Sequence, residues 1–510
     1  MSKKPEKTKR ATLDFDIDIN GLGFMEKLEE IIPVKARYNT GLCLDLLCGR
    51  PQVGRYGDVV MNGGIAPYTG VCGAPNVGKS TWMDTMGTIL NQRYGIPYLK
   101  HNNEADANSE RFVDISYYVA PELQEWRYRM HEHKTLRELD LTAYTSADMW
   151  ETIRQLATKR EAQRDQLWKE TPFLDEDGEP VRILMPFAHS QDSLSEWKSN
   201  VIEKKLDEND VGAKENATFG LMHGAAKTQM VSEIPTMCAR GGMIIFQSAH
   251  MGDKFKLDAY APVRKKMEYL AGDLEIKFVS NNWRYLPNNL WWVMGNSPLL
   301  KKASDGKYYP EFQMPGFSKI AKDTDLTLCS IVNLRGKNGP SGVPFDLVMS
   351  QSRGLIPFMT NFRYIWESET SSGMGFGISG SDKAAWLDIY PEVKFNRFNI
   401  FELAEKDVRL QRAIRFTADL CILHERIRNY PRHQLCSAQE LYTDIKKLYD
   451  WNEFLDTRDY WTWDHYTHPL KYLSIYDLLN FRLGVSTPYW KQWEHYGIDL
   501  HSHLLTSTAR

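Results

Sequence analysis

The chain has 510 residues, and its 63 lysines and arginines nearly balance 66 aspartates and glutamates, for a net charge of −3. This balance excludes a global basic field, so any nucleic-acid binding must come from local patches. No apolar run approaches the ~18 residues that a membrane span needs, and the N-terminus has no signal-peptide core. The seven cysteines are scattered without metal-ligand spacing, as in proteins of a reducing compartment. The composition therefore predicts a cytoplasmic protein without a membrane partner.

The first informative motif follows a short strand near the start of the globular part. Residues 1–35 predict a basic tail and a short helix, and the globular part begins near residue 36. Residues 68–72 have the pattern of a buried strand, and helical spacing begins at Thr81. Between them the sequence fits the pattern G-x-x-x-x-G-K-[ST]. The loop consists of Gly73, Ala74, Pro75, Asn76, Val77, Gly78, Lys79, Ser80 and Thr81.

A strand, a glycine-rich turn and a helix start form an anion site, because free backbone N–H groups and the positive end of the helix converge there. In this pattern Lys79 reaches the β and γ phosphates of ATP, and Ser80 holds Mg²⁺. The alternative is an ordinary glycine-rich loop. The flanking strand and helix favour nucleotide binding, which is the main prediction from the residues alone.

After this loop the chain continues to alternate strands and helices. Residues 97–101 predict a strand that leads into a polar cluster containing Glu104. Residues 149–168 predict a long amphipathic helix. An apolar run at 183–188 then leads through three polar residues to Asp192.

The middle of the chain predicts one more helix and strand before the pattern weakens. Residues 218–238 have helical spacing, and residues 243–246 predict a buried strand that ends at Gln247. Residues 250–320 have no clear period and are rich in lysine, tryptophan and tyrosine. We expect them to form a long insertion.

The last part of the chain predicts a closing set of strands and then a separate domain. Residues 326–334 and 343–349 predict two strands of a hairpin, and residues 358–366 predict a third strand. Residues 371–382 have the composition of a Gly/Ser linker, and 383–510 predict a Trp- and Tyr-rich helical domain. Alternating strands and helices before the linker predict an α/β fold with a mostly parallel sheet.

The order of these motifs resembles that of the RecA-type recombinases, nearest in pattern to the UvsX proteins of large phages. Residues 38–46, the glycine pair at 63–64 and the loop at 73–81 resemble the entry into that family's ATPase core. The resemblance covers about residues 36–370. It implies a RecA-like P-loop ATPase core, with a mostly parallel twisted sheet flanked by helices, and a C-terminal mainly helical domain.

The resemblance also implies roles for individual residues. Glu104 would be the catalytic glutamate, and Asp192 would be the Walker B aspartate that orders Mg²⁺ through its waters. Gln247 would sense the γ-phosphate, and Arg353 would reach a neighbouring subunit's nucleotide. From the residues alone, another interpretation stays open for each. Glu104 could be an exposed loop acid and Asp192 a helix N-cap. Gln247 could be a core amide and Arg353 a surface arginine.

Two stretches, 198–227 and 254–292, combine cations with aromatic residues, as single-strand DNA-binding surfaces do. The candidate DNA-binding residues are Lys214, Lys227, Lys254, Lys256, Arg264, Lys265 and Lys266. The aromatic candidates are Trp283, Trp291 and Trp292. The alternatives are a solvated helix face and a partly buried tryptophan cluster.

The function implied by the resemblance is an ATP-dependent recombinase that polymerises on single-stranded DNA and promotes homologous pairing and strand exchange. Self-association into a filament or ring would follow, with mediator or single-strand-binding proteins as further partners. If the chain is encoded by a phage, its location would be the cytoplasm of the bacterial host. Two other functions remain open: a hexameric replicative helicase, which the basic loop 335–342 resembles, and a nucleotide-gated structural protein without DNA activity.

Overall fold

The computed structural model describes most of the chain in segments. The described residues are 38–47, 51–53, 59–61, 64–103, 110–119, 135–140, 146–174, 180–197, 219–254, 267–298, 326–337, 339–351, 353–368, 374–381, 383–396, 398–426, 437–448, 451–463 and 471–482. The expected basic tail at 1–35 lies outside them. Within these segments no helix is both long enough and apolar enough to cross a bilayer.

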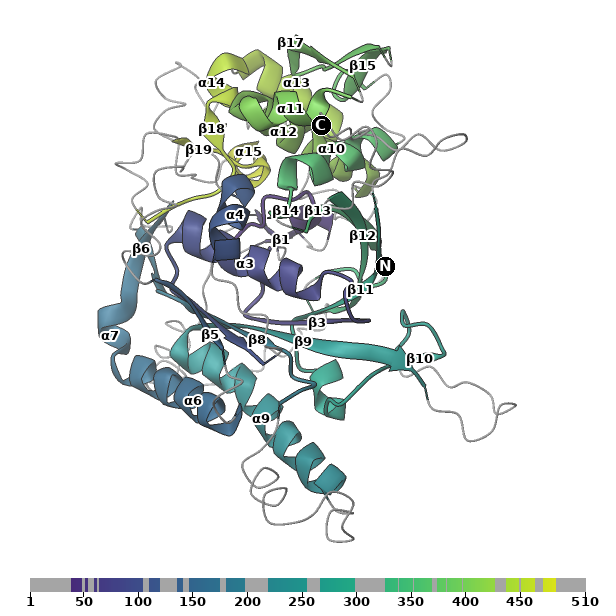
Figure 1. Cartoon of the computed structure of the whole chain (residues 1–510). Helices are drawn as coiled ribbons and strands as arrows, with labels where there is room; N and C mark the ends of the chain where they lie inside the picture. Colours follow the sequence, from purple (N-terminus) through teal and green to yellow (C-terminus); the bar gives the residue numbers. More distant parts are fainter. Residues whose placement is uncertain are drawn as a thin grey trace, which may run out of the picture.

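A ten-stranded sheet organises the molecule (Figure 1). Its order is β14 (Gly354–Leu355), β13 (Pro344–Ser350), β12 (Leu326–Gly336), β11 (Asn289–Pro298), β3 (Tyr68–Gly73), β9 (Met243–Asp253), β8 (Phe187–Asp192), β4 (Tyr98–Asn102) and β5 (Leu136–Asp140), with β10 (Leu274–Ile276) beside β9. Neighbours from β11 to β5 run parallel. The strands β12, β13 and β14 are antiparallel. The predicted α/β fold with a mostly parallel sheet is confirmed.

Helices cover both faces of this sheet (Figure 1). One face packs on α3 (Lys79–Tyr94) and α4 (Glu110–Val119), which share a hydrophobic core with residues of β3, β12 and β13. The other face packs on α6 (Ser146–Ala162) and α9 (Phe219–Gly241) in a second core. The parallel strands are therefore buried on both sides, as parallel sheets require.

Polar residues occupy the buried strand β8, and each of His189, Ser190, Gln191 and Asp192 makes a hydrogen bond to a neighbouring strand. Ser190 Oγ lies 2.6 Å from the Tyr98 hydroxyl, and the Gln247 amide donates to Gln191 Oε1 at 2.8 Å. His189 Nε2 lies 2.6 Å from His101 Nδ1. Buried polar side chains are tolerated where they are hydrogen-bonded. The run before Asp192 is therefore a strand despite its composition.

The C-terminal part of the chain folds onto the α3 side of the sheet. It contains α10 (Pro357–Glu367), α11 (Ile400–Lys406), α12 (Val408–Arg426), α13 (Ala438–Leu448), α14 (Trp451–Leu455), α15 (Ile475–Arg482), a three-stranded sheet of β15 (Ile378–Ser381), β16 (Ala384–Leu387) and β17 (Tyr390–Phe395), and the pair β18 (Thr457–Arg458) and β19 (Lys471–Tyr472). Its buried residues belong to the same hydrophobic cluster as α3 and α4. One continuous core thus joins the two parts.

The remaining elements are short or lie at the edges. They are α2 (Leu44–Leu47), the pair β1 (Pro51–Val53) and β2 (Val59–Met61), α7 (Arg164–Leu167), the pair β6 (Trp168–Leu174) and β7 (Pro180–Leu184), and the 3₁₀ helix η4 (Asn281–Arg284). Pro186 falls between β7 and β8, where a missing backbone donor breaks no ladder.

The strand predicted at 358–366 is wrong, because this segment is the helix α10. Pro357 stands in its first turn, where proline is tolerated and its fixed φ suits a helix. Phe358, Phe362 and Ile365 recur at helical spacing and are all buried. The segment therefore does not form the third strand that the sequence predicts.

Two expected boundaries also differ from the structure. The expected insertion at 250–320 contains β11, which pairs with β3 in the middle of the sheet, so Asn289–Pro298 belongs to the sheet and not to an insertion. Residues 378–381 of the expected linker form β15, which pairs with β16. In this stretch Gly375, Gly377 and Gly380 have positive φ, which glycine adopts at little cost.

Candidate functional site

The predicted phosphate loop lies between β3 and α3, at the carboxyl ends of the parallel strands. Gly78 is the N-cap of α3 with φ 95°, and Asn76 has φ 59°, so both adopt the left-handed conformation. No described side chain caps this helix start. Its first N–H groups and positive dipole end therefore face the loop, which is the arrangement that binds phosphate.

The two flanking glycines are needed for different reasons. A Cβ atom at Gly73 would lie 2.7 Å from the carbonyl oxygen of Val293 and 2.9 Å from the side chain of Val77, so close packing requires glycine there. At Gly78 the nearest atom to a Cβ would be Met349 Sδ at 3.4 Å, an ordinary contact, and glycine is required by the positive φ. The loop shape is thus set by β11 as well as by its own sequence.

The side chains of the loop are arranged for an anion. Lys79 is buried and its ammonium donates to the carbonyl of Ala74 at 2.7 Å, so the charge is held across the loop. Ser80 is half-buried at the first turn of α3. The Thr81 hydroxyl accepts a hydrogen bond from the Arg111 guanidinium. A cation, a hydroxyl and uncapped amides meet at one place.

Asp192 ends β8 at the same edge of the sheet. Its carboxylate is buried, and Ser248 of the intervening strand β9 donates to Oδ1 at 2.5 Å. The hydroxyl of Ser80 and the carboxylate of Asp192 are oxygen ligands of the kind that Mg²⁺ prefers. These are the donor types that a magnesium ion takes, and the assignment of Ser80 and Asp192 to a metal stays a prediction.

A buried charge cluster lies under the first turns of α3. The ammonium of Lys100 is 3.0 Å from Asp84 and 3.3 Å from Glu138, and Arg111 is 4.0 Å from Asp84. Burial lowers the pKa of Lys100, but the carboxylates of Asp84, Asp192 and Glu138 raise it by more. Lys100 therefore stays charged and holds β4, β5 and α3 together. Glu104, the predicted catalytic glutamate, lies outside the described residues.

Gln247 does not end its strand, so that prediction is wrong. β9 continues to Asp253, and Gln247 is 1% exposed. Its carbonyl accepts from the Tyr68 hydroxyl at 2.6 Å and from the Trp283 indole at 3.0 Å. These bonds lie on the α9 side of the sheet, where Tyr68 and Trp283 belong to the second core. Gln247 is the core amide that the residues alone had left open.

His250 is the residue of β9 that lies beside the start of the phosphate loop. It is the Cα partner of Gly73 in the β3–β9 ladder, at the start of the phosphate loop. Residues alternate faces along a strand, so His250 shares the face of Ser248, which contacts Asp192. Sequence reasoning missed it because Ser248, His250 and Gly252 give β9 no apolar pattern after Gln247.

Arg353 is engaged within its own chain. It donates to the Tyr118 hydroxyl at 2.8 Å and pairs with Glu405 at 3.2 Å. Its side chain is 49% exposed, and it lies over the ring of Tyr117 at 5.7 Å. These contacts tie α4 to α11. A role toward a neighbouring subunit stays a prediction.

The structure removes part of the predicted DNA surface. Lys227 is 2% exposed and donates to the carbonyls of Ser195 and Phe278 at 3.0 and 2.8 Å, so its assignment to DNA is wrong. Trp283 and Trp291 are also buried, which excludes base stacking on them. Lys254 is partly exposed. The residues Lys214, Lys256, Arg264, Lys265 and Lys266 lie outside the described residues.

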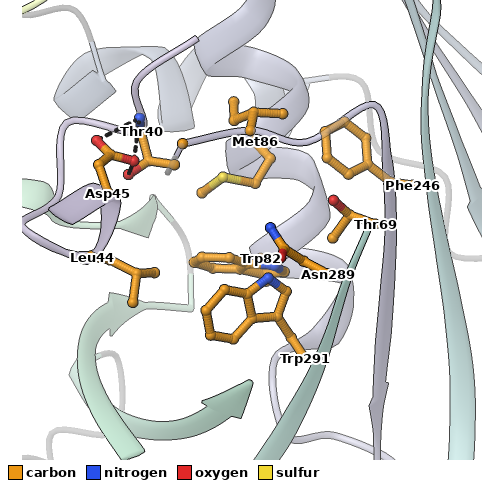
Figure 2. A pocket seen from close by; sticks show the side chains of 11 residues that line it. Thr40, Leu44, Asp45, Thr69, Trp82, Met86, Phe246, Asn289 and Trp291 are labelled. Atoms are coloured by element: carbon orange, nitrogen blue, oxygen red, sulfur yellow. Dashed lines mark hydrogen bonds between the residues drawn. The ribbon is translucent and has the colours of Figure 1, made fainter. Parts of the chain in front are cut away.

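A small apolar cavity lies behind α3 (Figure 2). Its volume is ≈ 20 Å³, room for one or two water molecules. Trp82 and Trp291 line it together, with ring centroids 6.0 Å apart, and Thr40 is hydrogen-bonded to Asp45 at its rim. No residue of the phosphate loop lines it. The cavity is a packing defect and not a nucleotide site.

Comparisons with known proteins add little to this geometry. No protein-family model matches the sequence, and no curated protein matches it. One similar solved structure is the crystal structure of the RadB recombinase, at 10% identity and a TM-score of 0.28. The alignment covers 57% of this chain and 92% of that chain. A likeness at this level carries no weight for function.

Proposed function

We propose that this chain is an ATP-binding and ATP-hydrolysing protein of the RecA type. The observation that carries the proposal is the loop at 73–81, held between β3 and α3 with Asp192 at the same sheet edge. An uncapped helix start with a lysine and a hydroxyl suits the triphosphate of a nucleotide.

Each residue of the site has a chemical task in this proposal. Lys79 neutralises charge on the β and γ phosphates, and the α3 amides position them. Ser80 and Asp192 would hold Mg²⁺, which supplies further neutralisation of the phosphate charge when bound. Glu104 would orient and polarise the attacking water. His250 is the Cα partner of Gly73 and would sense the γ-phosphate. A change at His250 would then be transmitted along β9.

The finer proposal is that the protein polymerises on single-stranded DNA and promotes homologous pairing and strand exchange. Its support is the order of motifs in the sequence and the partly exposed Lys254. Filament or ring formation, with mediator or single-strand-binding partners, belongs to the same proposal.

A second function is favoured by a specific observation. Lys227, Trp283 and Trp291 are buried, so the described residues hold less of a DNA surface than the sequence predicted. The burial of these three residues is compatible with a nucleotide-gated structural protein without DNA activity, which is the second candidate.

The nucleotide site is tested with Lys79→Ala. Binding of a slowly hydrolysed ATP analogue, measured by calorimetry, should fall at least about a hundredfold, because a charge-assisted contact to phosphate is lost. Lys394→Ala, far along the chain in β17, is the matched control and should bind normally. Unchanged affinity in Lys79→Ala would remove the nucleotide site from residues 73–81.

The DNA function is tested on the unaltered chain. Single-stranded DNA should stimulate ATP hydrolysis at low salt, and the stimulation should fall as salt rises, because counterions compete for phosphates. Electron microscopy with the ATP analogue should show filaments on the DNA. Rings that unwind forked DNA would favour the helicase, and an ATPase indifferent to DNA would favour the structural protein.

A further inference from the structure

Four arginines converge on a cavity between the sheet domain and the C-terminal part. Arg93 comes from the last turn of α3, Arg412 and Arg415 from α12, and Arg458 from β18. They line a cavity of ≈ 80 Å³ together with Tyr460. The cavity is separate from the phosphate loop, since none of residues 73–81 lines it.

These guanidinium groups are buried but not fully hydrogen-bonded. Arg93, Arg412 and Arg415 are each 6% exposed, and Arg458 is 3% exposed. Within the described structure, Nη1 of Arg93, Arg415 and Arg458 has no hydrogen-bond partner. Buried donors are rarely left unsatisfied in native proteins, and an unmet donor calls for an explanation.

The hydrogen bonds that the arginines do make hold their other nitrogens in place. Arg93 Nε donates to the Val119 carbonyl at 2.5 Å, and Arg458 Nη2 donates to Thr462 Oγ1 at 2.9 Å. Arg412 donates to Thr457 Oγ1 at 2.9 Å. The Tyr460 ring lies 4.9 Å from the guanidinium carbon of Arg93 and 5.1 Å from that of Arg458. These bonds therefore fix the orientation of the guanidinium groups around the cavity.

Three carboxylates balance the arginines incompletely. Arg415 pairs with Asp45 at 3.5 Å, Asp419 at 3.2 Å and Asp459 at 3.3 Å. Burial raises the pKa of Asp419 to about 7, so this carboxylate is only partly ionised near neutral pH. Positive charge is thus in excess in a buried place, where an anion would be strongly attracted.

We propose that this arginine pocket binds a phosphate group, either inorganic phosphate or the terminal phosphate of a small monoester. A cavity of ≈ 80 Å³ has room for about five water-sized atoms, enough for the four oxygens of phosphate. Guanidinium forks match phosphate geometry and can each bind two oxygens. Because Arg93 belongs to α3 and the others to the C-terminal part, the bound phosphate bridges the two. The proposal does not depend on the function of the phosphate loop.

The test uses the full chain with Lys79→Ala, so that the phosphate loop does not contribute. Inorganic phosphate should raise the thermal denaturation midpoint in a saturable manner, at constant ionic strength adjusted with chloride. Absence of a phosphate-specific rise would overturn the proposal without any further variant. Calorimetry should then compare inorganic phosphate with glycerol 3-phosphate. The one that binds more tightly shows whether the pocket takes free phosphate or a monoester.

Two further substitutions in that background locate the site. Arg458→Gln should weaken phosphate binding at least about tenfold, because a charged donor is lost. Asp459→Asn should strengthen phosphate binding, because a competing carboxylate is removed. If Arg458→Gln does not fold, Asp459→Asn alone tests whether phosphate binds in this pocket. Arg154→Gln on the exposed face of α6 is the control and should change nothing. Unaltered affinity in both pocket variants would place phosphate elsewhere.

Discussion

Lys100 is a single residue on which two buried carboxylates depend. Its ammonium lies within 3.3 Å of both Asp84 and Glu138, and all three side chains are almost fully buried. A buried charge that loses its partner keeps its desolvation cost without the compensating attraction. The cluster therefore makes Lys100 a stability residue that underlies the phosphate loop.

We predict that Lys100→Met lowers the free energy of unfolding by about 3 to 5 kcal/mol. The measurement is urea denaturation followed by tryptophan fluorescence. The triple variant Lys100→Met, Asp84→Asn, Glu138→Gln should recover part of the loss, because neither buried carboxylate is then left charged without Lys100. Lys406→Met, which breaks an exposed ion pair with Glu402, is the control and should leave stability nearly unchanged. An equal effect at both lysines would contradict the argument.

The histidine pair of β4 and β8 predicts a pH dependence. Burial lowers the pKa of His101 from 6.5 to about 4, and burial with the neighbouring His101 lowers the pKa of His189. Unfolded histidines take up protons near pH 6.5, but the folded pair does not. The stabilisation is therefore complete above pH 6.5 and is lost as pH falls toward 4, by about 3 kcal/mol for His101 alone.

This dependence is measured as the denaturation midpoint at pH 7 and at pH 4.5. The double variant His101→Gln, His189→Gln should lose less stability over this interval than the unaltered chain, because neither site then titrates. Parallel losses in the two proteins would assign the pH effect to other groups.

At the residue scale, sequence reasoning succeeded where the chemistry is local. The loop at 73–81 could be predicted because its glycines, lysine and hydroxyl are contiguous, and the structure places it between a strand and a helix. Gln247 and Lys227 were misassigned because their partners come from distant strands and loops. A single sequence does not reveal whether an amide or an ammonium faces a ligand or the core.

At the scale of elements, α3 contains a glycine whose role is packing. Gly87 lies in the middle of this helix, and a Cβ atom there would come within 2.2 Å of the Tyr98 ring. Helix propensity favours alanine by ~1 kcal/mol. The clash with a fully buried ring in a close-packed core should outweigh that gain.

We predict that Gly87→Ala destabilises the protein by about 1 to 3 kcal/mol, measured as the urea midpoint. Gly224→Ala in α9 is the matched control, because nothing lies within 4 Å of a Cβ atom there. It should stabilise by about 0.5 to 1 kcal/mol through helix propensity. If Gly87→Ala were the more stable of the two, close packing of α3 on β4 would be refuted.

Helices and strands could be predicted where the residue pattern is strong. The prediction failed where tertiary packing determines the type of element. The strands at 326–334 and 343–349 were predicted from their apolar pattern, and they are β12 and β13. The segment 358–366 was predicted as a strand because it is aromatic, but its buried side chains recur at helical spacing. β11 was missed because Asn289 to Pro298 mixes tryptophan with polar residues at the sheet centre.

At the scale of the whole molecule, the sheet domain and the C-terminal part share one core. Leu46 and Leu90 belong to the same buried cluster as Leu410 and Ile414 of α12. Arg415 of α12 pairs with Asp45 of α2 across the junction. The two parts therefore stabilise each other, which composition could not reveal because it shows only a glycine-rich segment between them.

We predict that a chain truncated after residue 370 does not fold. It would expose the apolar surface that α12 covers, so it should be insoluble or rapidly degraded by protease, unlike the full chain. Solubility and limited proteolysis check this outcome. A soluble, protease-resistant fragment 36–370 with normal ATP-analogue binding would show that the C-terminal part is an independent domain.

Tyr94 connects the end of α3 to the C-terminal part of the chain. It is the last residue of α3. Its hydroxyl accepts from the backbone N–H of Asn39 at 2.7 Å, and its carbonyl accepts from the Trp463 indole at 2.5 Å. The helix is thus clamped at the end opposite its phosphate loop. A nucleotide that shifts or tilts α3 would therefore also move Trp463. Binding at the first turn of the helix would in this way be transmitted to the C-terminal part.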